Sequence, residues 1–293
     1  MADPISASEF APWRSLLFVP ANRKAFVDKA HLRGADAYVL DLEDSVPDGQ
    51  KATAREGIIE AAESVSRSGA AAVVRINQSL RLANKDLQAC IHASVQALVI
   101  PKVASRDHIN TLCERIDGLE AERGIHKGHT RLIAQIECVH GLANLDEIAQ
   151  SSPRLLAMSL GSEDFSASAG MEPTPETLLA PNQAVVFACR RARILPLGFP
   201  ASIADFSDAT HFRKIIAFAR QLGFVGALCI HPSQIATLNE AFSPSDTELE
   251  NARQLISAYE QGLSKDLGAI EFNGYMVDAP VVARARALLL RYS

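Results

Sequence analysis

The stretch AYVLDLED at residues 37–44 carries the pattern on which the fold prediction depends: a short apolar run that ends in acidic residues. An apolar run without polar alternation is typical of a strand buried on both faces of a sheet. Similar runs recur along the chain. They predict eight strands, at residues 15–19, 37–42, 71–77, 97–103, 131–137, 155–161, 194–197 and 227–231.

Longer segments with helical spacing lie between these runs, for example at residues 51–67, 106–123, 178–193 and 208–222. Strands that alternate with helices form parallel sheets covered on both faces. Eight such units favour a (β/α)8 TIM barrel over an open doubly wound sheet.

The pattern changes after the eighth predicted strand. The segment SPSD at residues 243–246 signals the start of a helix that we expect to run through Gln261. A connection containing Gly262, Gly268 and Gly274 then leads to a final helix near Ala279. The sequence therefore predicts a catalytic barrel over residues 13–242 and an appended C-terminal helical module over residues 243–293.

Composition narrows the function classes. Of 293 residues, 48% are hydrophobic and 22% charged, as in ordinary globular proteins. The net charge of −5 argues against a nucleic-acid partner, and no apolar run is long enough for a membrane span. The five cysteines are scattered singly and residues 1–12 lack the basic region of a secretory signal, so we expect a cytoplasmic protein.

Charged or polar residues stand at the ends of six predicted strands. In a (β/α)8 barrel these ends open on one face, so the residues should converge on one pocket. Converging charges of both signs are costly to bury without a ligand or metal. The alternative is that polar residues merely follow each strand where the chain leaves the core. The residues concerned lie at positions 41–44, 75–77, 102, 135–137, 162–164 and 231.

The acidic residues suggest a hard cation. Glu137 and Asp164 would come from adjacent strands, and Mg²⁺ prefers a few carboxylates supplemented by water and substrate oxygens. Two alternatives stay open, since Glu163 is an equally placed ligand and Asp164 is a possible N-cap of the next helix. No histidine or cysteine spacing indicates zinc.

Arg75 offers a planar fork for a carboxylate or an enolate oxygen, although it could instead pair structurally with Asp41 or Glu43. These two acids share one face of their strand and could bind the waters of a metal ion. For Lys102, two roles stay open: a structural ion pair and a part in the site. We interpret His231 as a hydrogen-bonded structural residue.

Six motifs, in order from about residue 13 to the C-terminal region, resemble the citrate lyase β-subunit and malyl-CoA lyase family of the HpcH/HpaI aldolase-like superfamily. Each is weak alone, but together they are specific for the family and not for a substrate. They are RSLLFVPAN at 14–22, LDLEDSV at 40–46, RIN at 75–77, IE at 136–137, GSED at 161–164 and CIHPSQI at 229–235.

This resemblance implies a (β/α)8 barrel with a C-terminal segment, assembled as a homotrimer or hexamer. It implies Mg²⁺ as cofactor, with Glu137 and Asp164 at the positions of its ligands. Arg75 matches the arginine that binds the acyl or keto-acid end of the substrate. Glu43 and Asp44 match acids near the waters of the metal.

Two further sets of residues follow from the resemblance. Phe18, Arg23 and Lys29 fall where relatives contact coenzyme A. The segment GYMVDAP at 274–280 resembles a motif of malyl-CoA and citramalyl-CoA lyases, whose aspartate reaches the site of a neighbouring subunit and transfers a proton. Asp278 is therefore the candidate acid/base, and the C-terminal module is expected to pack on a neighbouring subunit. On physical grounds alone, Asp278 could equally cap the helix that follows.

The chain departs from the family pattern at two places. The seventh unit, residues 194–202, lacks an acidic residue that many relatives carry, and residues 181–182 are Pro-Asn where relatives often have Ala-Arg. Both departures lie near the expected rim of the pocket and leave the acyl group open.

The predicted function is Mg²⁺-dependent cleavage of a 3-hydroxyacyl-CoA thioester, of citramalyl-CoA or malyl-CoA type, to acetyl-CoA and a 2-keto acid. One alternative is a citrate lyase β subunit that acts on a citryl thioester with acyl-carrier and transferase subunits. Others are a malyl-CoA thioesterase and a non-catalytic barrel.

Overall fold

A computed structural model describes residues 13–205 and 207–292. The predicted absence of a signal in residues 1–12 falls outside these ranges. Contacts divide the chain into a barrel unit, Pro12–Phe242, and a C-terminal unit containing Ser243–Ser293, and each unit is described here by itself.

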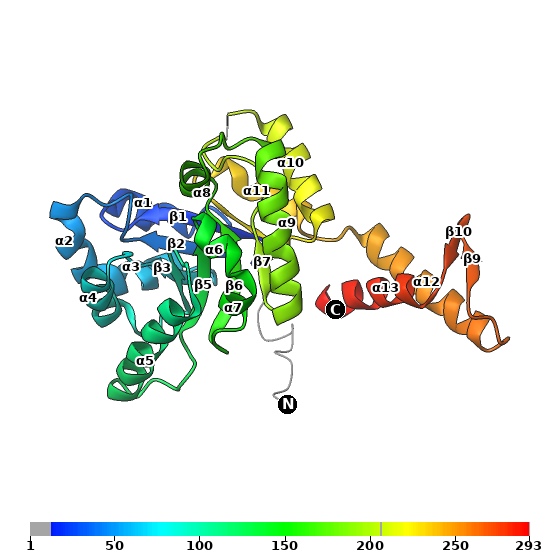
Figure 1. Ribbon diagram of the computed structural model, residues 1–293, viewed down its shortest axis with the longest axis horizontal. Coiled ribbons are helices and arrows are strands. Elements are labelled where there is room, and N and C mark those ends of the chain that lie inside the picture. Colours follow the sequence, from blue (N-terminus) through cyan, green and yellow to red (C-terminus); the bar gives the residue numbers. More distant parts are fainter. Residues whose placement is uncertain (1–12, 206, 293) are drawn as a thin grey trace. The chain divides into compact units, whose positions relative to one another are not determined.

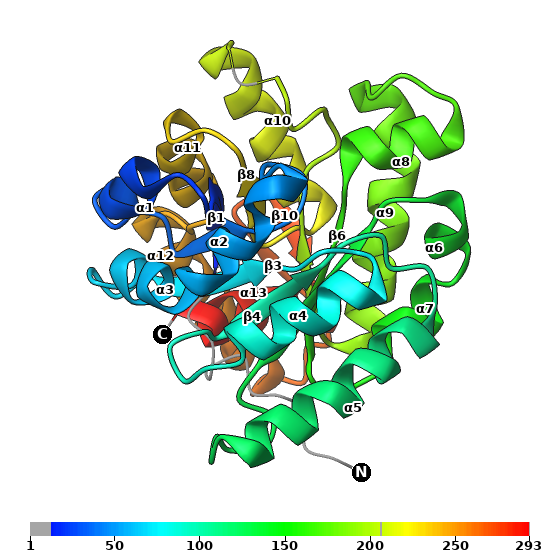
Figure 2. The same cartoon turned by 90° about the vertical axis from the view of Figure 1, so that its left-hand side faces the viewer.

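The barrel unit contains eight parallel strands whose order, β7-β6-β5-β4-β3-β2-β1-β8, follows the chain (Figures 1 and 2). A parallel pairing of Leu197 with Gly226 closes the sheet between β7 and β8. The predicted (β/α)8 barrel is therefore confirmed. The strands are β1 (Ser15–Pro20), β2 (Ala37–Asp41), β3 (Ala71–Arg75), β4 (Ala97–Ile100), β5 (Arg131–Ile136), β6 (Leu155–Leu160), β7 (Leu195–Leu197) and β8 (Ala227–Cys229).

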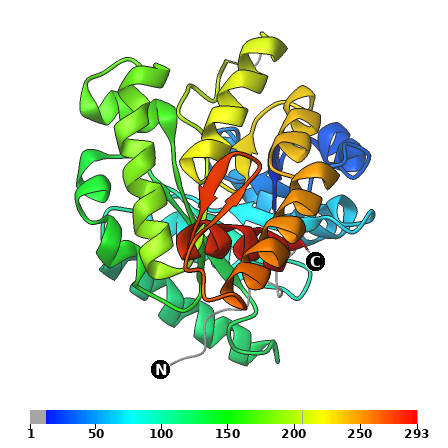
Figure 3. The ribbon, with the colours of Figure 1, turned by 90° about the vertical axis from the view of Figure 1, so that its right-hand side faces the viewer.

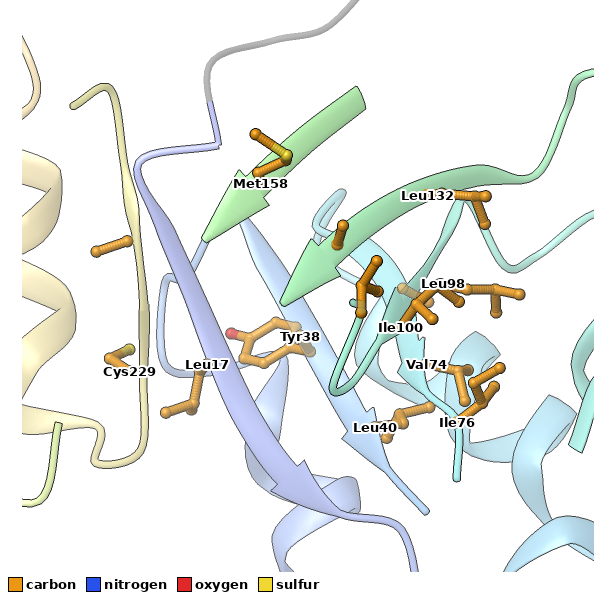
Figure 4. Close-up of a cluster of buried hydrophobic side chains, with 14 of the residues drawn as sticks. Leu17, Tyr38, Leu40, Val74, Ile76, Leu98, Ile100, Leu132, Met158 and Cys229 are labelled. Atoms are coloured by element: carbon orange, nitrogen blue, oxygen red, sulfur yellow. The ribbon is translucent and has the colours of Figure 1, made fainter. Parts of the chain in front are cut away.

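Helices surround the strands, and alternate strand residues pack against them. Tyr38, Leu40, Val74 and Leu98 belong to this buried layer, which Figure 4 shows together with its neighbours. The helices are α1 (Lys24–Ala30), α2 (Lys51–Glu56), α3 (Ile58–Val65), α4 (Leu80–Cys90), α5 (Arg106–Glu122), α6 (Val139–Ala143), α7 (Leu145–Ala149), α8 (Ser162–Ala169), α9 (Pro175–Ala192), α10 (Ala209–Leu222) and α11 (Ser233–Ala241).

The other strand residues fill the inside of the barrel. Val39, Val73, Val99 and Ile133 are fully buried and alternate with the residues of the helix-facing layer. A packed interior leaves the carboxyl ends of the strands as the place where a cavity can open.

Two helix predictions need correction. The segment with helical spacing at residues 51–67 is helical but divided in two, because Gly57 interrupts it and the chain forms α2 and α3. Glycine weakens a helix interior, which explains the break. Helix α9 begins at Pro175, earlier than predicted, because Thr174 caps it and proline suits its first turn.

The C-terminal unit contains the two predicted helices, α12 (Asp246–Leu263) and α13 (Ala279–Tyr292) (Figure 3). The expected glycine-containing connection instead includes an antiparallel hairpin of β9 (Ile270–Phe272) and β10 (Tyr275–Val277). Asn273 and Gly274 turn between these strands with φ of 51° and 80°. An Asn-Gly pair favours this left-handed turn, so the hairpin signal was present in the sequence.

No helix in the described ranges is long and apolar enough to cross a membrane. All five cysteines are free thiols.

Gly226, at the barrel closure, gives a test of the fold. A Cβ atom there would lie 1.9 Å from the backbone oxygen of Trp13, which cannot yield as a side chain would. We expect Gly226→Ala to lower the free energy of unfolding by about 3 kcal/mol, as overpacking does. Denaturant titration measures the change. Gly118→Ala, in the open on α5, is the control and should be neutral or stabilising, and equal effects would contradict the prediction.

Candidate active site

A cavity of about 430 Å³ opens at the carboxyl ends of the strands. Asp41, Asp44, Arg75, Glu137 and Asp164 line it, so the strand ends that the sequence singled out meet at one place. The remaining lining residues are Phe18, Pro20, Ser45, Gln135, Ser159, Leu160, Gly161, Ser162, Glu163, Gly198, Phe199, Ala201, Ile203, Leu228 and Ile230.

Arg75 is the centre of the ionic wall of this cavity. Its Nε and Nη2 donate to the two oxygens of Asp41 at 2.7 and 2.8 Å, a bidentate pair. Its Nη1 lies 3.1 Å from Glu43 Oε2 and donates to Asp44 at 3.3 Å. The guanidinium also stacks over the Phe18 ring, 4.8 Å from its centroid. The structural pairing and the cavity position considered for Arg75 therefore both occur.

Local structure fixes this arrangement. Asp41 and Arg75 are register partners on β2 and β3, so their side chains emerge together. Asp41 also accepts hydrogen bonds from the backbone N–H groups of Glu43 and Ser45, which turns the chain after β2. Burial tends to raise the pKa of Asp41, but the hydrogen bonds and charge of Arg75 outweigh it and lower that pKa.

A buried polar network supports the turn from below. The Lys51 ammonium donates to the carbonyls of Leu42 and Glu43 at 3.0 and 2.7 Å, and to Asn77 Oδ1 at 2.6 Å. Asn77 in turn donates to Asp86 at 2.8 Å. Sequence reasoning missed Lys51 and Asp86 because both sit within helices, where charged residues usually face solvent.

Lys102 connects the acids of the cavity. Its Nζ lies 3.4 Å from Asp164 and 3.8 Å from Glu43, and its backbone N–H donates to Glu137 Oε2 at 2.8 Å. Lys102 has φ of 52°, unusual for a residue with a side chain. Burial lowers its pKa, but the charges of Glu43 and Asp164 outweigh this and raise it. Lys102 thus takes part in the site as an ion-pair partner.

Glu43 and Glu137 are buried carboxyl groups that lack full compensation. Burial raises the pKa of Glu43 to about 7, against the opposing charge of Arg75. Burial and the nearby Glu43 raise the pKa of Glu137 to about 8. Glu43 Oε2 accepts no hydrogen bond. A Cβ on Gly161 would lie 2.7 Å from Glu137 Oε1, so this glycine leaves room for the carboxylate.

These features fit a divalent cation. Glu137 and Asp164 are both held by Lys102 and line one cavity, and their carboxylates are hard oxygen donors. Among residues 13–205 and 207–292 no three or more acidic, histidine or cysteine side chains are grouped to hold a metal alone. Mg²⁺ commonly binds through one or two carboxylates, with water and substrate completing its shell.

Glu163 and Asp164, the two acids at the start of α8, have different partners. Glu163 Oε1 accepts from Ser202 at 2.6 Å and from Ser162 at 3.2 Å. Asp164 lies in the first turn, whereas Gly161 occupies the N-cap position, so the N-cap interpretation of Asp164 is wrong. This leaves the Asp164 carboxylate directed at Lys102 and the cavity.

The other predicted residues, Arg23, Lys29, His231 and Asp278, are not among those that line the cavity. Arg23 and Lys29 are exposed, just before and within α1, and do not line the cavity. The His231 ring bonds Ser233 Oγ at 2.7 Å, as a structural histidine would. Asp278 belongs to the C-terminal unit, where its Oδ1 accepts from the backbone N–H of Val281 at 3.4 Å in the manner of a cap.

Comparison with known proteins gives a consistent result. Residues 14–232 match the profile of the HpcH/HpaI aldolase/citrate lyase family. The chain is 33% identical to the citrate lyase subunit beta of Leuconostoc mesenteroides subsp. cremoris, over 94% of this chain and 92% of the relative. It is 34% identical to the L-malyl-CoA/beta-methylmalyl-CoA lyase of Rhodobacter capsulatus, over 94% and 93%.

Among solved structures, the chain resembles the protein CitE from Mycobacterium tuberculosis in complex with magnesium, acetoacetate and coenzyme A. The TM-score is 0.75 at 29% identity, and the match covers 94% of this chain and 97% of that one. RipC from Yersinia pestis gives a TM-score of 0.65 at 32% identity, over 80% and 97%.

The raised pKa of Glu137 predicts a pH-dependent stability. The folded protein binds the proton of the Glu137 carboxyl more tightly than the unfolded chain does. The stability that this protonated carboxyl gives the fold is therefore fully present below about pH 4.5 and is lost as the pH rises through about 8. We expect the free energy of unfolding of the metal-free protein to fall by roughly 2 kcal/mol from pH 6 to 9. Urea titrations at each pH measure this. Glu137→Gln should flatten the slope, and an unchanged slope would rule out Glu137 as its source.

Proposed function

Because the chain belongs to the HpcH/HpaI aldolase/citrate lyase family, as its motifs predicted, we propose that it cleaves a 3-hydroxyacyl-CoA thioester with the help of Mg²⁺. It is a carbon–carbon lyase, the class that its relatives carry in their names. The products are acetyl-CoA and a 2-keto acid, and the substrate is of malyl-CoA or citramalyl-CoA type. One observation carries the proposal: Arg75, Glu137 and Asp164 line a single cavity.

Mg²⁺ is the proposed cofactor, and Glu137 and Asp164 are its proposed ligands. Structural relatives were solved in complex with magnesium, one of them together with coenzyme A. Bound there, Mg²⁺ would polarise the hydroxyl oxygen that becomes the ketone. We favour Asp164 over Glu163 because Lys102 joins it to Glu137, while Glu163 is engaged by Ser202.

The side chains of this chain supply the remaining steps. The 3-hydroxyl group must lose a proton as the carbon–carbon bond breaks. We assign its acceptance to Glu43, which does not itself line the cavity but lies 3.1 Å from the cavity-lining Arg75 and has a pKa of about 7. Arg75 supplies positive charge where the enolate develops, through its Nη1 edge, which Asp41 does not occupy and which Glu43 and Asp44 contact. Asp44, 3.3 Å from that edge, holds its orientation.

The enolate of acetyl-CoA then needs a proton on carbon. We assign this step to Asp278 of a neighbouring copy in a homotrimer or hexamer, which makes the C-terminal unit part of the catalytic assembly. Phe18 lines the cavity, and Arg23 and Lys29 offer exposed cations for the phosphates of coenzyme A. We propose no nucleic-acid or membrane partner for the reaction, and we place it in the cytoplasm.

A citrate lyase β subunit is the second candidate, since such subunits match this chain about as well as malyl-CoA lyases do. Purification together with acyl-carrier and transferase subunits would favour it, whereas turnover of free CoA thioesters by the isolated chain would favour the first. A malyl-CoA thioesterase would release free CoA with the acid intact. A non-catalytic barrel would tolerate Glu137→Gln and bind no Mg²⁺.

Metal dependence is tested by chelation and by substitution of the ligands. EDTA should abolish keto-acid formation, and Mg²⁺ should restore it. Glu137→Gln and Asp164→Asn should each weaken Mg²⁺ binding at least about tenfold, since each removes an anionic ligand. Calorimetric Mg²⁺ titration measures this, with the exposed Glu147→Gln as control. Loss in Glu163→Gln but not in Asp164→Asn would reassign the ligand, and activity in EDTA would refute the metal.

The proton-transfer role of Asp278 is tested by Asp278→Asn. We expect kcat to fall by about 100-fold or more with little change in KM, because general acid catalysis contributes about 10²–10⁴-fold. Steady-state kinetics of keto-acid release give both constants. Asp266→Asn, in the same unit, should keep wild-type kcat. Full activity of Asp278→Asn would leave that residue only its helix-capping contact.

A further inference from the structure

Three buried oxygen atoms on one side of the barrel have no hydrogen-bond partner. They are Oε1 of Gln135, Oγ of Ser159 and Oδ1 of Asn182. Their residues are only 6%, 1% and 1% exposed. A buried polar group without a partner destabilises the folded protein, so three such groups on one side call for an explanation.

Two of these residues line the cavity. Gln135 and Ser159 are register partners on β5 and β6, and both belong to the cavity wall. Asn182 lies on α9, where its Nδ2 donates to the carbonyl of Leu178 and its Oδ1 is left without a donor. All three are neutral, in contrast to the ionic wall around Arg75. We call Gln135, Ser159 and Asn182, together with Gly198, the neutral wall.

Gly198 completes this wall by having no side chain. It lines the cavity after β7, and a Cβ atom there would lie 3.5 Å from Asn182 Oδ1 and 3.3 Å from the Phe224 ring. Its φ of 142° also disfavours any other residue. The two departures from the family pattern, at residues 181–182 and 194–202, thus meet here as Asn182 and Gly198.

The electrostatics of the cavity disfavour another anion beside the neutral wall. Arg75 is the only cationic residue that lines the cavity within the described part of the chain, and Asp41 occupies its fork. Five acidic residues line the same cavity: Asp41, Asp44, Glu137, Glu163 and Asp164. A carboxylate placed against the neutral wall would face two amide oxygens that can only accept, no cationic side chain, and the Ser159 hydroxyl as its one donor among the three unpartnered atoms.

We propose that the neutral wall is the subsite for the side group of the keto-acid half of the substrate. It selects a short neutral group that donates a hydrogen bond, such as hydroxymethyl, over a carboxylate. A ligand hydroxyl group suits oxygen atoms that lack a donor, because it can donate a hydrogen bond to one of them. The assignment to the keto-acid half rests on the proposed function, whereas the preference for a donor rests on the three oxygens alone.

Three 2-keto acids test the preference because they differ only in this side group. Pyruvate carries a methyl group, hydroxypyruvate a hydroxymethyl group and oxaloacetate a carboxymethyl group. In calorimetric titrations of the full chain with Mg²⁺, hydroxypyruvate should bind about fivefold more tightly than pyruvate, the effect of one hydrogen bond. Freshly prepared oxaloacetate should bind about tenfold more weakly than pyruvate.

Substitutions locate the effect. Gln135→Leu and Ser159→Ala should each bring the affinity ratio of hydroxypyruvate to pyruvate within about twofold of one. Ser64→Ala is the matched control, because Ser64 Oγ is also buried and unpartnered but lies on α3, and the ratio should stay at the wild-type value. Ser159→Ala removes a single oxygen and gives the decisive ratio if Gln135→Leu fails to fold.

The proposal is overturned by any of three results. Wild-type oxaloacetate binding as tight as pyruvate binding would show that the wall tolerates a carboxylate. Equal wild-type binding of hydroxypyruvate and pyruvate would mean that the oxygens hold ordered water only. An unchanged ratio in both variants would place the selectivity elsewhere.

The binding assay separates this inference from the proposed function. If the ranking of keto acids holds but no thioester is cleaved with Mg²⁺, the proposed lyase reaction fails and the subsite stands. If thioesters are cleaved but the three keto acids show no such ranking, the subsite fails and the lyase reaction stands.

Discussion

The bidentate pair of Arg75 and Asp41 is the interaction on which the rest of the site depends. It joins two register partners on β2 and β3, and both side chains are almost completely buried. A buried charge whose partner is removed costs about 3–5 kcal/mol, so neither residue is tolerable alone. Because Asp41 takes the fork of Arg75, Glu43 and Asp44 share only its Nη1 edge. The acids deeper in the cavity are therefore short of positive charge.

That shortage of positive charge explains why the pKa values of two acids at the cavity are raised. Burial raises the pKa of Glu43 and of Glu137, and the cations present do not compensate. Lys102 relieves part of the imbalance, because its ammonium group lies between Asp164 and Glu43 and forms an ion pair with each, at 3.4 Å and 3.8 Å. Lys51 is buried, and its ammonium group donates its three hydrogen bonds to two backbone carbonyls and to Asn77, so it does not neutralise these acids. A site with this charge distribution is prepared to accept a cation.

The sequence was a good guide to the parts of the molecule that follow periodic rules. Eight apolar runs predicted the barrel because a strand buried on both faces leaves a continuous apolar signature. Arg75 and Glu137 were found because charges at strand ends must meet on one face of a barrel. The break at Gly57 and the hairpin at Asn273-Gly274 were missed because each depends on one or two residues. Lys51 and Ser159 were missed because only their three-dimensional neighbours show that they are buried at the site.

The cavity separates the chemistry of bond cleavage from the choice of substrate. The pKa values of Glu43 and Glu137 depend on burial and on the charges of Arg75, Asp44, Lys102, Asp41 and Asp164, all of which are ionic residues. Gln135 and Ser159 carry no charge, so they are not a source of those charge interactions. A change on the neutral wall can therefore alter which side group fits while the protonation states of the ionic wall stay as they are. Such a change would let a chain whose barrel and sequence profile match its family differ from its relatives in substrate, without disturbing the charges of the ionic wall.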